Sequence, residues 1–549
     1  MISFQSVIIA AYVSCTLAAS YHWPSPQYDA LEALLYEGKS PSGFNAGNLG
    51  NNCVTRNTGR APPTKSSIAA EWTYSSFLVF TKAYHDMATH NITDGTGGLD
   101  ASIFYELDRA ENIGAGQVNS VIDFQNAAQK YISHADVIAL GVVWGVAACS
   151  GPVIPFRGGR RDALSAGSPG VPEPQQDLAD HIEKFRLQGF NQEEMIELVA
   201  CGHTLGVVRQ LDFPEIVNTE VDFDRTPGFD HAIVSEYLDG STRNPLVVVA
   251  NKTLASDSRI FFSDRNATVQ KLNSPESFSR TCSTILEKMI NTVPKGVILG
   301  EPIILLPVKL VNAQITANNG QLIFNAVLRL TKKKTTVTTS RTVNMYWCDA
   351  IGDNVNCSKR INIASSPVER SPDPLGAVLI ARGLSYNTYT FNAPINAQAS
   401  VSQFWFEVDE GNGSGPKVHD NDRSRYFVAQ DKVIHIPSGT STVFAGYINN
   451  NLVYNTTVLA AVRTSLEVKL LLFFLINHMA ELVAPEDAPA MLHGYSFYQS
   501  TLPLKPWGEP ILNFEILTSG VTYTDEPRYI TDFDRNLGQL SPISTVPTV

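Results

Sequence analysis

The sequence predicts a two-domain protein with a mainly α-helical N-terminal half and a mainly β, sandwich-like C-terminal half. The length of 549 residues exceeds the size at which a single hydrophobic core stops growing. From about residue 66 to 290 apolar residues recur with helical spacing, whereas beyond about 300 short alternating runs are separated by turn residues. We therefore expect a helical domain over residues 21–295 and a β-rich domain over residues 300–549.

The first residues resemble a targeting segment. An apolar run from Val7 to Leu17 ends in the small residues Ala18, Ala19 and Ser20, which predicts a signal peptide over residues 1–20 and a secreted protein. The alternative is a buried N-terminal helix. The formal charge of −12 argues against nucleic-acid binding. The longest later apolar run, residues 470–477, is too short to span a bilayer, so no membrane anchor is expected.

The cysteines are typical of an oxidising compartment. Without Cys15 the mature chain keeps an even set of six, which are candidates for disulfide bonds. Cys348 and Cys357 flank a short turn-rich segment and are predicted to pair with each other. For Cys53, Cys149, Cys201 and Cys282, three connectivities remain open. Six glycosylation sequons support a glycosylated exterior protein, and they begin at Asn91, Asn251, Asn266, Asn356, Asn412 and Asn455.

Two helices in the N-terminal half carry clear start signals. Residues 133–150 begin with Ser133, place an acidic residue three positions later, and are apolar nearly all round, as expected of a capped, buried helix. Asn191 caps a second helix over 192–202, and Glu194 completes a capping box. On this helix His203 falls on the apolar face.

The C-terminal half reads as strands. Residues 308–330 form two alternating runs around Asn318, Asn319 and Gly320, which predicts a β-hairpin. Residues 465–486 fit neither the helical nor the strand pattern. The two explanations are a buried helix and an error in the gene structure. Further strands are expected at residues 335–348, 388–391, 401–409, 432–437 and 442–449.

Three motifs in the helical half carry potential chemistry. Taken alone, a histidine on an apolar helix face is more often a core residue than a ligand. The order and spacing of the motifs, however, resemble those of the plant-type haem peroxidase superfamily, most closely its secreted fungal branch, over about residues 66–290. The motifs are AYHD at 83–86 followed by GGLDAS at 97–102, CGHTLG at 201–206, and FSD at 262–264.

The resemblance implies a haem-peroxidase fold that binds haem b, reacts with hydrogen peroxide and oxidises a small aromatic reductant. His85 would be the distal histidine. Asn112 and Glu106 would orient it, because a neutral imidazole needs one nitrogen held as a donor if the other is to accept a proton. Glu111 is a competing candidate whose spacing fits less well. On the proximal side, His203 would be the iron ligand and Asp264 the buried carboxylate that strengthens its donation.

The resemblance also implies two calcium sites. The first would take ligands from Asp86, Gly98, Asp100 and Ser102, whose hard oxygen atoms suit Ca²⁺. The alternative is an ordinary loop rich in aspartate and glycine. The second site would use Thr204, Asp224, Thr226 and Asp230, although the family usually has one more residue before the last aspartate.

The family's arginine four residues before the distal histidine is missing, and Thr81 stands there. A guanidinium at that position stabilises the negative charge that develops as peroxide cleaves. The preceding residues 73–80 are β-branched and aromatic, unusual for a helix interior. Either this segment is translated intron, or the distal pocket has degenerated. We therefore expect the chain to bind haem but to activate peroxide poorly.

Substrate class is only weakly encoded. Arg209 stands where manganese-oxidising relatives carry acidic residues, which leaves a phenolic or aromatic reductant as the expectation. The competing hypothesis is a catalytically weak haem-binding or cell-wall-interacting glycoprotein. In that case Tyr346, Trp347 and Trp405 of the β-rich domain could bind wall polysaccharide, although strand alternation indicates that at least some of them are core residues.

Overall fold

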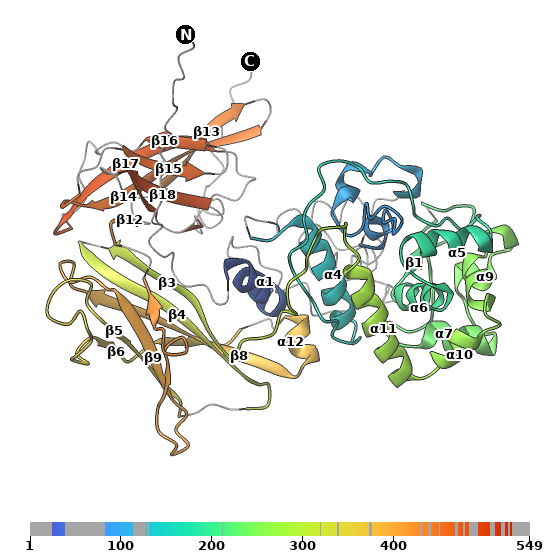
Figure 1. Cartoon of the computed structure of the whole chain (residues 1–549), viewed down its shortest axis with the longest axis horizontal. Helices are drawn as coiled ribbons and strands as arrows, with labels where there is room; N and C mark the ends of the chain where they lie inside the picture. The colour runs from blue at the N-terminus through green and yellow to red at the C-terminus, as the bar shows by residue number, and fades with distance from the viewer. Residues whose placement is uncertain are drawn as a thin grey trace, which may run out of the picture.

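The computed structural model resolves most of both halves of the chain. Helices dominate up to residue 290 and strands dominate from residue 308 (Figure 1). It describes residues 25–38, 83–112, 128, 131–210, 212–318, 320–336, 340–372, 376–428, 431–436, 441–448, 451–466, 470–475, 478–481, 492–504, 511–517, 522–524 and 528–529.

Most helices lie before residue 291, and α12 (Ala377–Ala381) lies within the strand-rich half. Residues 83–87 are helical as well. The labelled helices are α1 (Pro26–Glu37), η1 (Ser102–Tyr105), η2 (Ala110–Asn112), α4 (His134–Ala148), α5 (Leu178–Leu187), α6 (Gln192–His203), α7 (Ala232–Asp239), α8 (Pro245–Val248), η3 (Lys252–Leu254), α9 (Ser256–Phe262), α10 (Ala267–Lys271), α11 (Pro275–Ile290) and α12 (Ala377–Ala381).

Both predicted helix starts are confirmed. The Ser133 hydroxyl accepts a hydrogen bond from the Asp136 N–H at 3.0 Å, and nearly every residue of α4 is buried. Asn191 and Glu194 form the reciprocal capping box at the start of α6. Because α4 is apolar all round, it contributes residues from all its faces to the helical core.

The predicted disulfide chemistry is confirmed where the described residues allow it. Cys348 pairs with Cys357, as their spacing predicted. Cys201 pairs with Cys282, which joins α6 to α11. Cys149 is also disulfide-bonded. Cys53, Thr81, residues 73–80 and the signal peptide predicted for residues 1–20 lie outside the described residues.

The strands fill the second half of the chain. A short pair, β1 and β2, lies in the helical half. The strands are β1 (Val207–Val208), β2 (Val221–Asp222), β3 (Val308–Asn318), β4 (Gln321–Lys333), β5 (Thr342–Trp347), β6 (Ile363–Ala364), β7 (Val368–Arg370), β8 (Leu384–Ile395), β9 (Gln403–Asp409), β10 (Lys417–His419), β11 (Tyr426–Phe427), β12 (Val433–His435), β13 (Ser441–Ile448), β14 (Asn451–Arg463), β15 (Leu470–Leu475), β16 (His478–Glu481), β17 (Tyr495–Leu504), β18 (Ile511–Leu517), β19 (Thr522–Thr524) and β20 (Arg528–Tyr529).

Two sheets share one aromatic core. The predicted hairpin is confirmed as β3 and β4, which continue into a sheet of order β3-β4-β8-β7. A second sheet has the order β10-β9-β5-β6, with β11 also pairing with β9. Phe324 of the first sheet contacts Phe404 of the second with ring centroids 5.0 Å apart. The β-rich half is thus confirmed, while its sandwich arrangement stays a prediction.

The apolar run at residues 470–475 is a strand. The expectation of a buried helix was wrong: β15 pairs antiparallel with β16 and β18. Consecutive leucines and phenylalanines suit a strand that has neighbours on both edges as well as they suit a helix, so periodicity alone could not separate the two.

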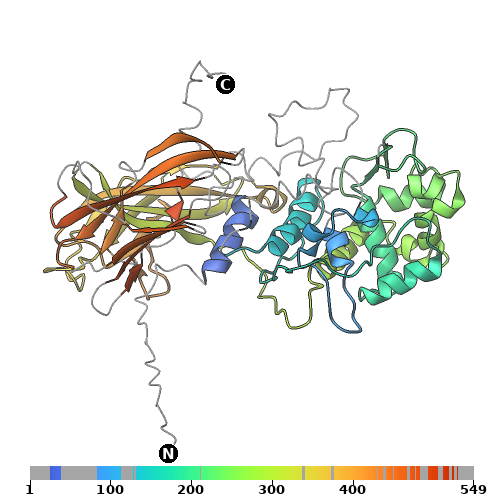
Figure 2. The same cartoon turned by 90° about the horizontal axis from the view of Figure 1, so that it is seen from above.

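Helix α1 lies between the two halves, as both views of the whole molecule show (Figures 1 and 2). On one side the Trp144 indole of α4 donates to the Leu35 carbonyl at 3.2 Å. Residues 377–379 of α12, which follow the first strands of the β-rich half, belong to the helical core. The two halves therefore share core residues.

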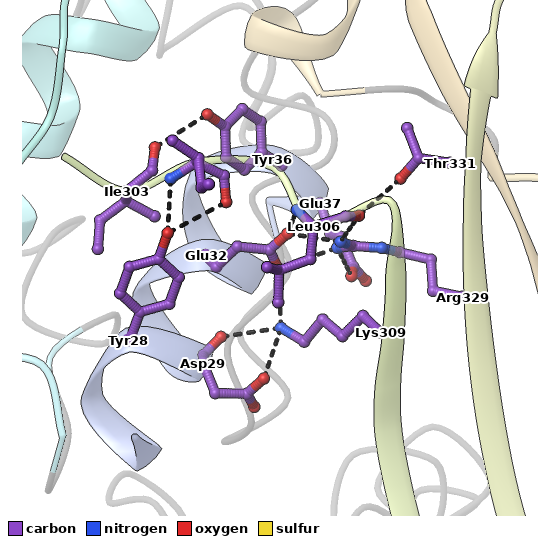
Figure 3. Close-up of polar contacts among 11 residues, drawn as sticks. Tyr28, Asp29, Glu32, Tyr36, Glu37, Ile303, Leu306, Lys309, Arg329 and Thr331 are labelled. Atoms are coloured by element: carbon purple, nitrogen blue, oxygen red, sulfur yellow. Dashed lines mark hydrogen bonds and ion pairs between the residues drawn. The ribbon is translucent and has the colours of Figure 1, made fainter. Parts of the chain in front are cut away.

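On its other side α1 meets the β-rich half through buried charges (Figure 3). The Arg329 guanidinium binds both carboxylate oxygens of Glu32, at 2.5 and 3.0 Å, and one oxygen of Glu37 at 2.5 Å. The Lys309 ammonium contacts Glu32 at 2.8 Å and Asp29 at 3.0 Å. Glu32 and Arg329 are both 0% exposed, so this ion-pair cluster is sealed from water.

No helix among the described residues combines the length and the apolar character that crossing a membrane requires.

Candidate functional site

A cavity in the helical half brings together the two histidines that the motifs singled out. Its free space measures about 770 Å³ including its opening to solvent. His85 and His203 both line it. The remaining lining residues are mostly apolar or aromatic, typical of a small-molecule or cofactor site with a few polar contacts. They include Tyr84, Val171, Pro172, Pro174, His181, Phe185, Leu198, Val199, Leu246 and Ile260.

His85 is held in one orientation by Asn112. Its Nδ1 atom lies 2.7 Å from Asn112 Oδ1, and Asn112 Nδ2 donates to the Glu106 carbonyl at 2.9 Å. Because the amide nitrogen is used as a donor, its oxygen must accept from Nδ1–H. The Nε2 atom of His85 is then left with its lone pair. Burial lowers the pKa of His85, and only the Asn112 hydrogen bond opposes this.

Glu106 contributes through its main chain. Its carboxylate points elsewhere: one oxygen accepts from the Gly167 N–H at 2.6 Å, and the other pairs with Arg109 at 3.1 Å. Glu111 lies 3.7 Å from Arg109, and within the described part of the chain it forms no hydrogen bond with His85. Asn112 is therefore the residue that touches His85, and Glu106 positions Asn112.

His203, the last residue of α6, is paired with Asp257. Its Nδ1 atom lies 2.7 Å from Asp257 Oδ2, and Asn244 Nδ2 donates to the same oxygen at 2.7 Å. Asp257 is 1% exposed, so this carboxylate is held in a water-poor setting. The Phe223 ring stacks on the His203 ring with centroids 4.3 Å apart and an angle of 17°.

The assignment of Asp264 as the partner of His203 was wrong. Asp264 lies beyond the C-terminal end of α9, and its carboxylate accepts from the Thr268 N–H at 2.8 Å and the Thr268 hydroxyl at 2.6 Å. It thus caps the first turn of α10. Asp257 lies in the first turn of α9, about two helical turns before Asp264, and on the side of α9 that faces α6.

The first set of predicted calcium ligands does converge. The Asp86 carboxylate accepts from the N–H groups of Asp100, Ala101 and Ile103 at 2.8–3.0 Å. The Ser102 hydroxyl lies 3.5 Å from the same carboxylate. Burial raises the pKa of Asp86 to about 8, and the charge of Asp100 adds to the effect.

Gly98, another predicted ligand, lies just before Asp100 and Ser102 in the chain, at φ +120°. A Cβ atom there would come within 2.9 Å of the Thr292 carbonyl oxygen, so the loop requires glycine at this position.

The second set converges as well, from two separate segments. The Thr204 hydroxyl donates to the Asp230 carbonyl at 2.8 Å and lies 3.3 Å from the Asp224 carboxylate. The Thr226 hydroxyl lies 3.1 Å from both the Asp224 and the Asp230 carboxylates. Burial raises the pKa of Asp224 to about 7, and hydrogen bonds from Thr226 oppose this.

Each oxygen cluster combines two carboxylates with hydroxyl or main-chain groups. In the described part of the chain no group of three or more His, Cys, Asp or Glu side chains gathers as a metal site. Mixed oxygen sets of this kind are nevertheless compatible with Ca²⁺ in their chemistry.

Several residues of the site were not foreseen from the sequence. Asp257, Asn244 and Phe223 contact His203 or its partner, and His181 lines the cavity. The segment L-A-S-D-S-R contains an aspartate directly after a serine, as F-S-D does, and this was the only available signal for Asp257. Nothing local marks Asn244 or Phe223, which reach the site through tertiary packing.

Comparisons with known proteins identify the class of this domain. Residues 61–269 match the family model described as "Peroxidase". A "WSC domain-containing protein" of Arthroderma benhamiae is 36% identical over 361 residues, covering 63% of this chain and 48% of the relative. The chain therefore contains a peroxidase domain of the plant-type peroxidase superfamily.

Other relatives carry peroxidase names and match shorter stretches of the chain. "L-ascorbate peroxidase 5, peroxisomal" of Arabidopsis thaliana is 31% identical over 185 residues, covering 33% of this chain and 64% of the relative. "Cytochrome c peroxidase, mitochondrial" of Yarrowia lipolytica is 32% identical over 130 residues, covering 23% of this chain and 38% of the relative. The chain thus spans less than two thirds of the length of each of these relatives.

Proposed function

We propose that this chain is a secreted peroxidase that binds haem b, reduces hydrogen peroxide and oxidises phenolic or aromatic donors in one-electron steps. The observation that carries this proposal is the cavity lined by His85 and His203, each with its Nδ1 atom engaged by another side chain. Both Nε2 atoms are therefore available to the cavity.

The residues present fit a haem. His203 would hold the iron through Nε2, because Asp257 occupies its Nδ1 atom and makes the imidazole a stronger donor. The apolar lining suits the faces of a porphyrin. When bound, the haem would supply the redox-active iron at which peroxide is reduced.

His85 would move the proton. Its neutral Nε2 can take a proton from bound peroxide and return it to the departing oxygen, as a general base and then a general acid. Asn112 keeps the other ring nitrogen protonated and so preserves the orientation that this transfer needs. Thr81 offers no cation for the departing oxygen, so we expect slow peroxide activation, and a Thr81→Arg variant should accelerate it.

An absorption spectrum of the purified protein after haem addition tests the proposal. We expect a Soret band that His203→Ala weakens, and a spectral response to hydrogen peroxide that His85→Leu slows by at least about a hundredfold. Absence of a Soret band would overturn haem binding. A Soret band with no response to peroxide would favour the alternative of a catalytically weak haem-binding glycoprotein.

We also propose calcium at the two oxygen clusters. In both, a carboxylate whose pKa is raised by burial lies beside a second carboxylate, and a divalent cation would relieve this repulsion. A chelator should lower the midpoint of thermal unfolding and added calcium should restore it. An Asp224→Asn variant should lose part of this response, and a midpoint insensitive to calcium would contradict the proposal.

Secretion and glycosylation complete the proposal. The sequon asparagines Asn251, Asn356, Asn412 and Asn455 are exposed, which leaves them open to glycan attachment. Binding of wall polysaccharide would need a surface other than Tyr346, Trp347 and Trp405, the aromatic residues that the sequence offered for it.

Two of these aromatic residues, Tyr346 and Trp405, are covered by neighbouring side chains. Trp405 is 5% exposed, and the Arg425 guanidinium lies 4.0 Å above its ring. Tyr346 stacks on Trp405, and Arg360 lies over the Tyr346 ring. These rings therefore offer no open face to a sugar.

A further inference from the structure

His181 is a buried histidine in the cavity wall that takes no part in the chemistry described above. It lies on α5 and is 1% exposed. It lines the same cavity as His85 and His203. Its Nε2 atom lies 3.0 Å from the Glu173 carbonyl oxygen, whereas its Nδ1 atom has no hydrogen-bond partner among the described residues.

The tautomer of His181 follows from these contacts. A carbonyl oxygen can only accept, so Nε2 carries the hydrogen and Nδ1 presents a lone pair. Burial lowers the pKa of His181, which keeps the ring neutral. Leaving a buried acceptor unpaired is costly, and unpaired groups of this kind are uncommon in native interiors.

The segment that fixes His181 is itself rigidly held. The Arg259 guanidinium donates to the carbonyl oxygens of Pro174 and Gln176 at 2.5 and 2.8 Å. The same guanidinium also bonds two carbonyl groups of residues 252–253. The Glu173 carbonyl, next to Pro174, therefore has a defined position, and the His181 ring is preorganised before any ligand arrives.

The surroundings of His181 favour a flat apolar ligand. Val171, Pro172 and Pro174 line the cavity beside it, and Phe185 lies one turn further along α5. A carboxylate would need a second N–H donor and hence a charged His181, which burial and the nearby Arg259 charge both disfavour. A hydroxyl group can donate to the neutral Nδ1 without this penalty.

We propose that His181 Nδ1 accepts a hydrogen bond from the hydroxyl group of the reductant and so selects hydroxylated aromatics, phenols above all, over their ethers. The inference deepens the proposed function and rests on it, since it assigns the reductant to the same cavity. His181 is thus a specificity-determining residue that binds the donor and leaves peroxide chemistry to His85.

The test compares a phenol with its O-methyl ether, for example guaiacol with veratrole. Binding to the resting haem-loaded protein is followed by the change in Soret absorbance, and binding to the haem-free chain by calorimetry, so neither readout depends on turnover. One hydrogen bond predicts about a fivefold preference for the phenol. His181→Phe should remove the preference while leaving ether binding within about twofold.

A matched control is His419→Gln on β10, a histidine remote from the cavity lining, which should keep the full preference. Equal binding of phenol and ether to the wild-type protein would overturn the inference without requiring any variant. An undiminished preference for the phenol in the His181→Phe variant would also overturn the inference. Absence of a Soret band would instead count against the proposed function, while calorimetry would still report on His181.

Discussion

The electronic state of His203 depends on a single carboxylate. Asp257 shares its Oδ2 atom between His203 and Asn244, so it is oriented from two sides and remains buried. A buried carboxylate that accepts from an imidazole N–H increases the basicity of the opposite nitrogen. Asp264, seven residues later, has no such contact with His203.

The pair of aspartates offers a matched experiment. In the haem-loaded protein, Asp257→Asn should shift the iron reduction potential to more positive values by at least about 60 mV, a tenfold change in the one-electron equilibrium, because a less anionic imidazole stabilises the ferric state less. Asp264→Asn should leave the potential unchanged. Potentiometric titration measures both, and equal shifts would contradict the assignment of Asp257.

The lowered pKa of His85 predicts a pH profile. Its ordinary value is about 6.5, so the folded protein keeps His85 neutral at and somewhat below that pH. We expect the rate constant for reaction with peroxide to fall only as the pH drops through the lowered folded pKa. Stability should be lost at higher pH than the rate, from about pH 6.5 down to the lowered folded pKa, because in that interval the unfolded chain binds the proton and the folded chain does not.

Stopped-flow absorption between pH 4 and 8 measures this profile. The hydrogen bond from His85 to Asn112 raises the pKa of His85. An Asn112→Val variant lacks this bond, so the midpoint of its pH–rate profile should move further toward acid. A midpoint above about pH 6.5 in the wild-type protein would show that burial does not control His85.

At the scale of elements, α6 places His203. Its N-terminal end is fixed by the Asn191 capping box, and Cys201 near its C-terminal end is tied to α11 by a disulfide bond. Glu194 also pairs with Lys288 of α11 at 2.6 Å. The helix is thus held at both ends, which limits how far the His203 ring can move.

The cap of α6 has a predictable energetic value. Asn191→Ala should lower the free energy of unfolding by about 1 kcal/mol, whereas Asn191→Gly should cost only a few tenths, because glycine tolerates the cap geometry. Urea denaturation followed by circular dichroism distinguishes the two. Equal losses would mean that the cap hydrogen bond contributes little.

Elements with local signals could be predicted from the sequence. The α4 and α6 caps, the β3–β4 hairpin and the Cys348–Cys357 pair are each encoded within about twenty residues, and each is confirmed. The contact between His203 and Asp257 spans 54 residues, and its partner could not be chosen by local pattern. The strand β15 is defined by its pairing with β18, some forty residues later, and periodicity did not reveal it.

At the scale of the whole molecule, the buried ion-pair cluster on α1 joins the two halves. Glu32 is surrounded by Arg329 and Lys309, whose charges lower its pKa despite the opposing effect of burial. Removing one partner of a buried pair leaves an uncompensated charge, which is costly. Helical and β-rich halves should therefore unfold together.

Arg329→Met tests this coupling. We expect a loss of about 3–5 kcal/mol and a calorimetric unfolding transition that splits into two. Arg360→Met removes an ion pair with Glu407 at a site that is 56% exposed, and it should cost less than about 1 kcal/mol. A single unsplit transition in Arg329→Met would show that the halves are held together by other contacts.

The position of α1 also bears on how the protein is made. Glu32 precedes Arg329 by 297 residues. At a translation rate of about 5–20 residues per second, the carboxylate waits roughly 15–60 s on the ribosome before its counter-charge is synthesised. Helix α1 cannot settle into its final place during that interval without burying a bare charge. The packing of α1 against the nascent helical half is thus completed only when the first hairpin of the β-rich half has emerged.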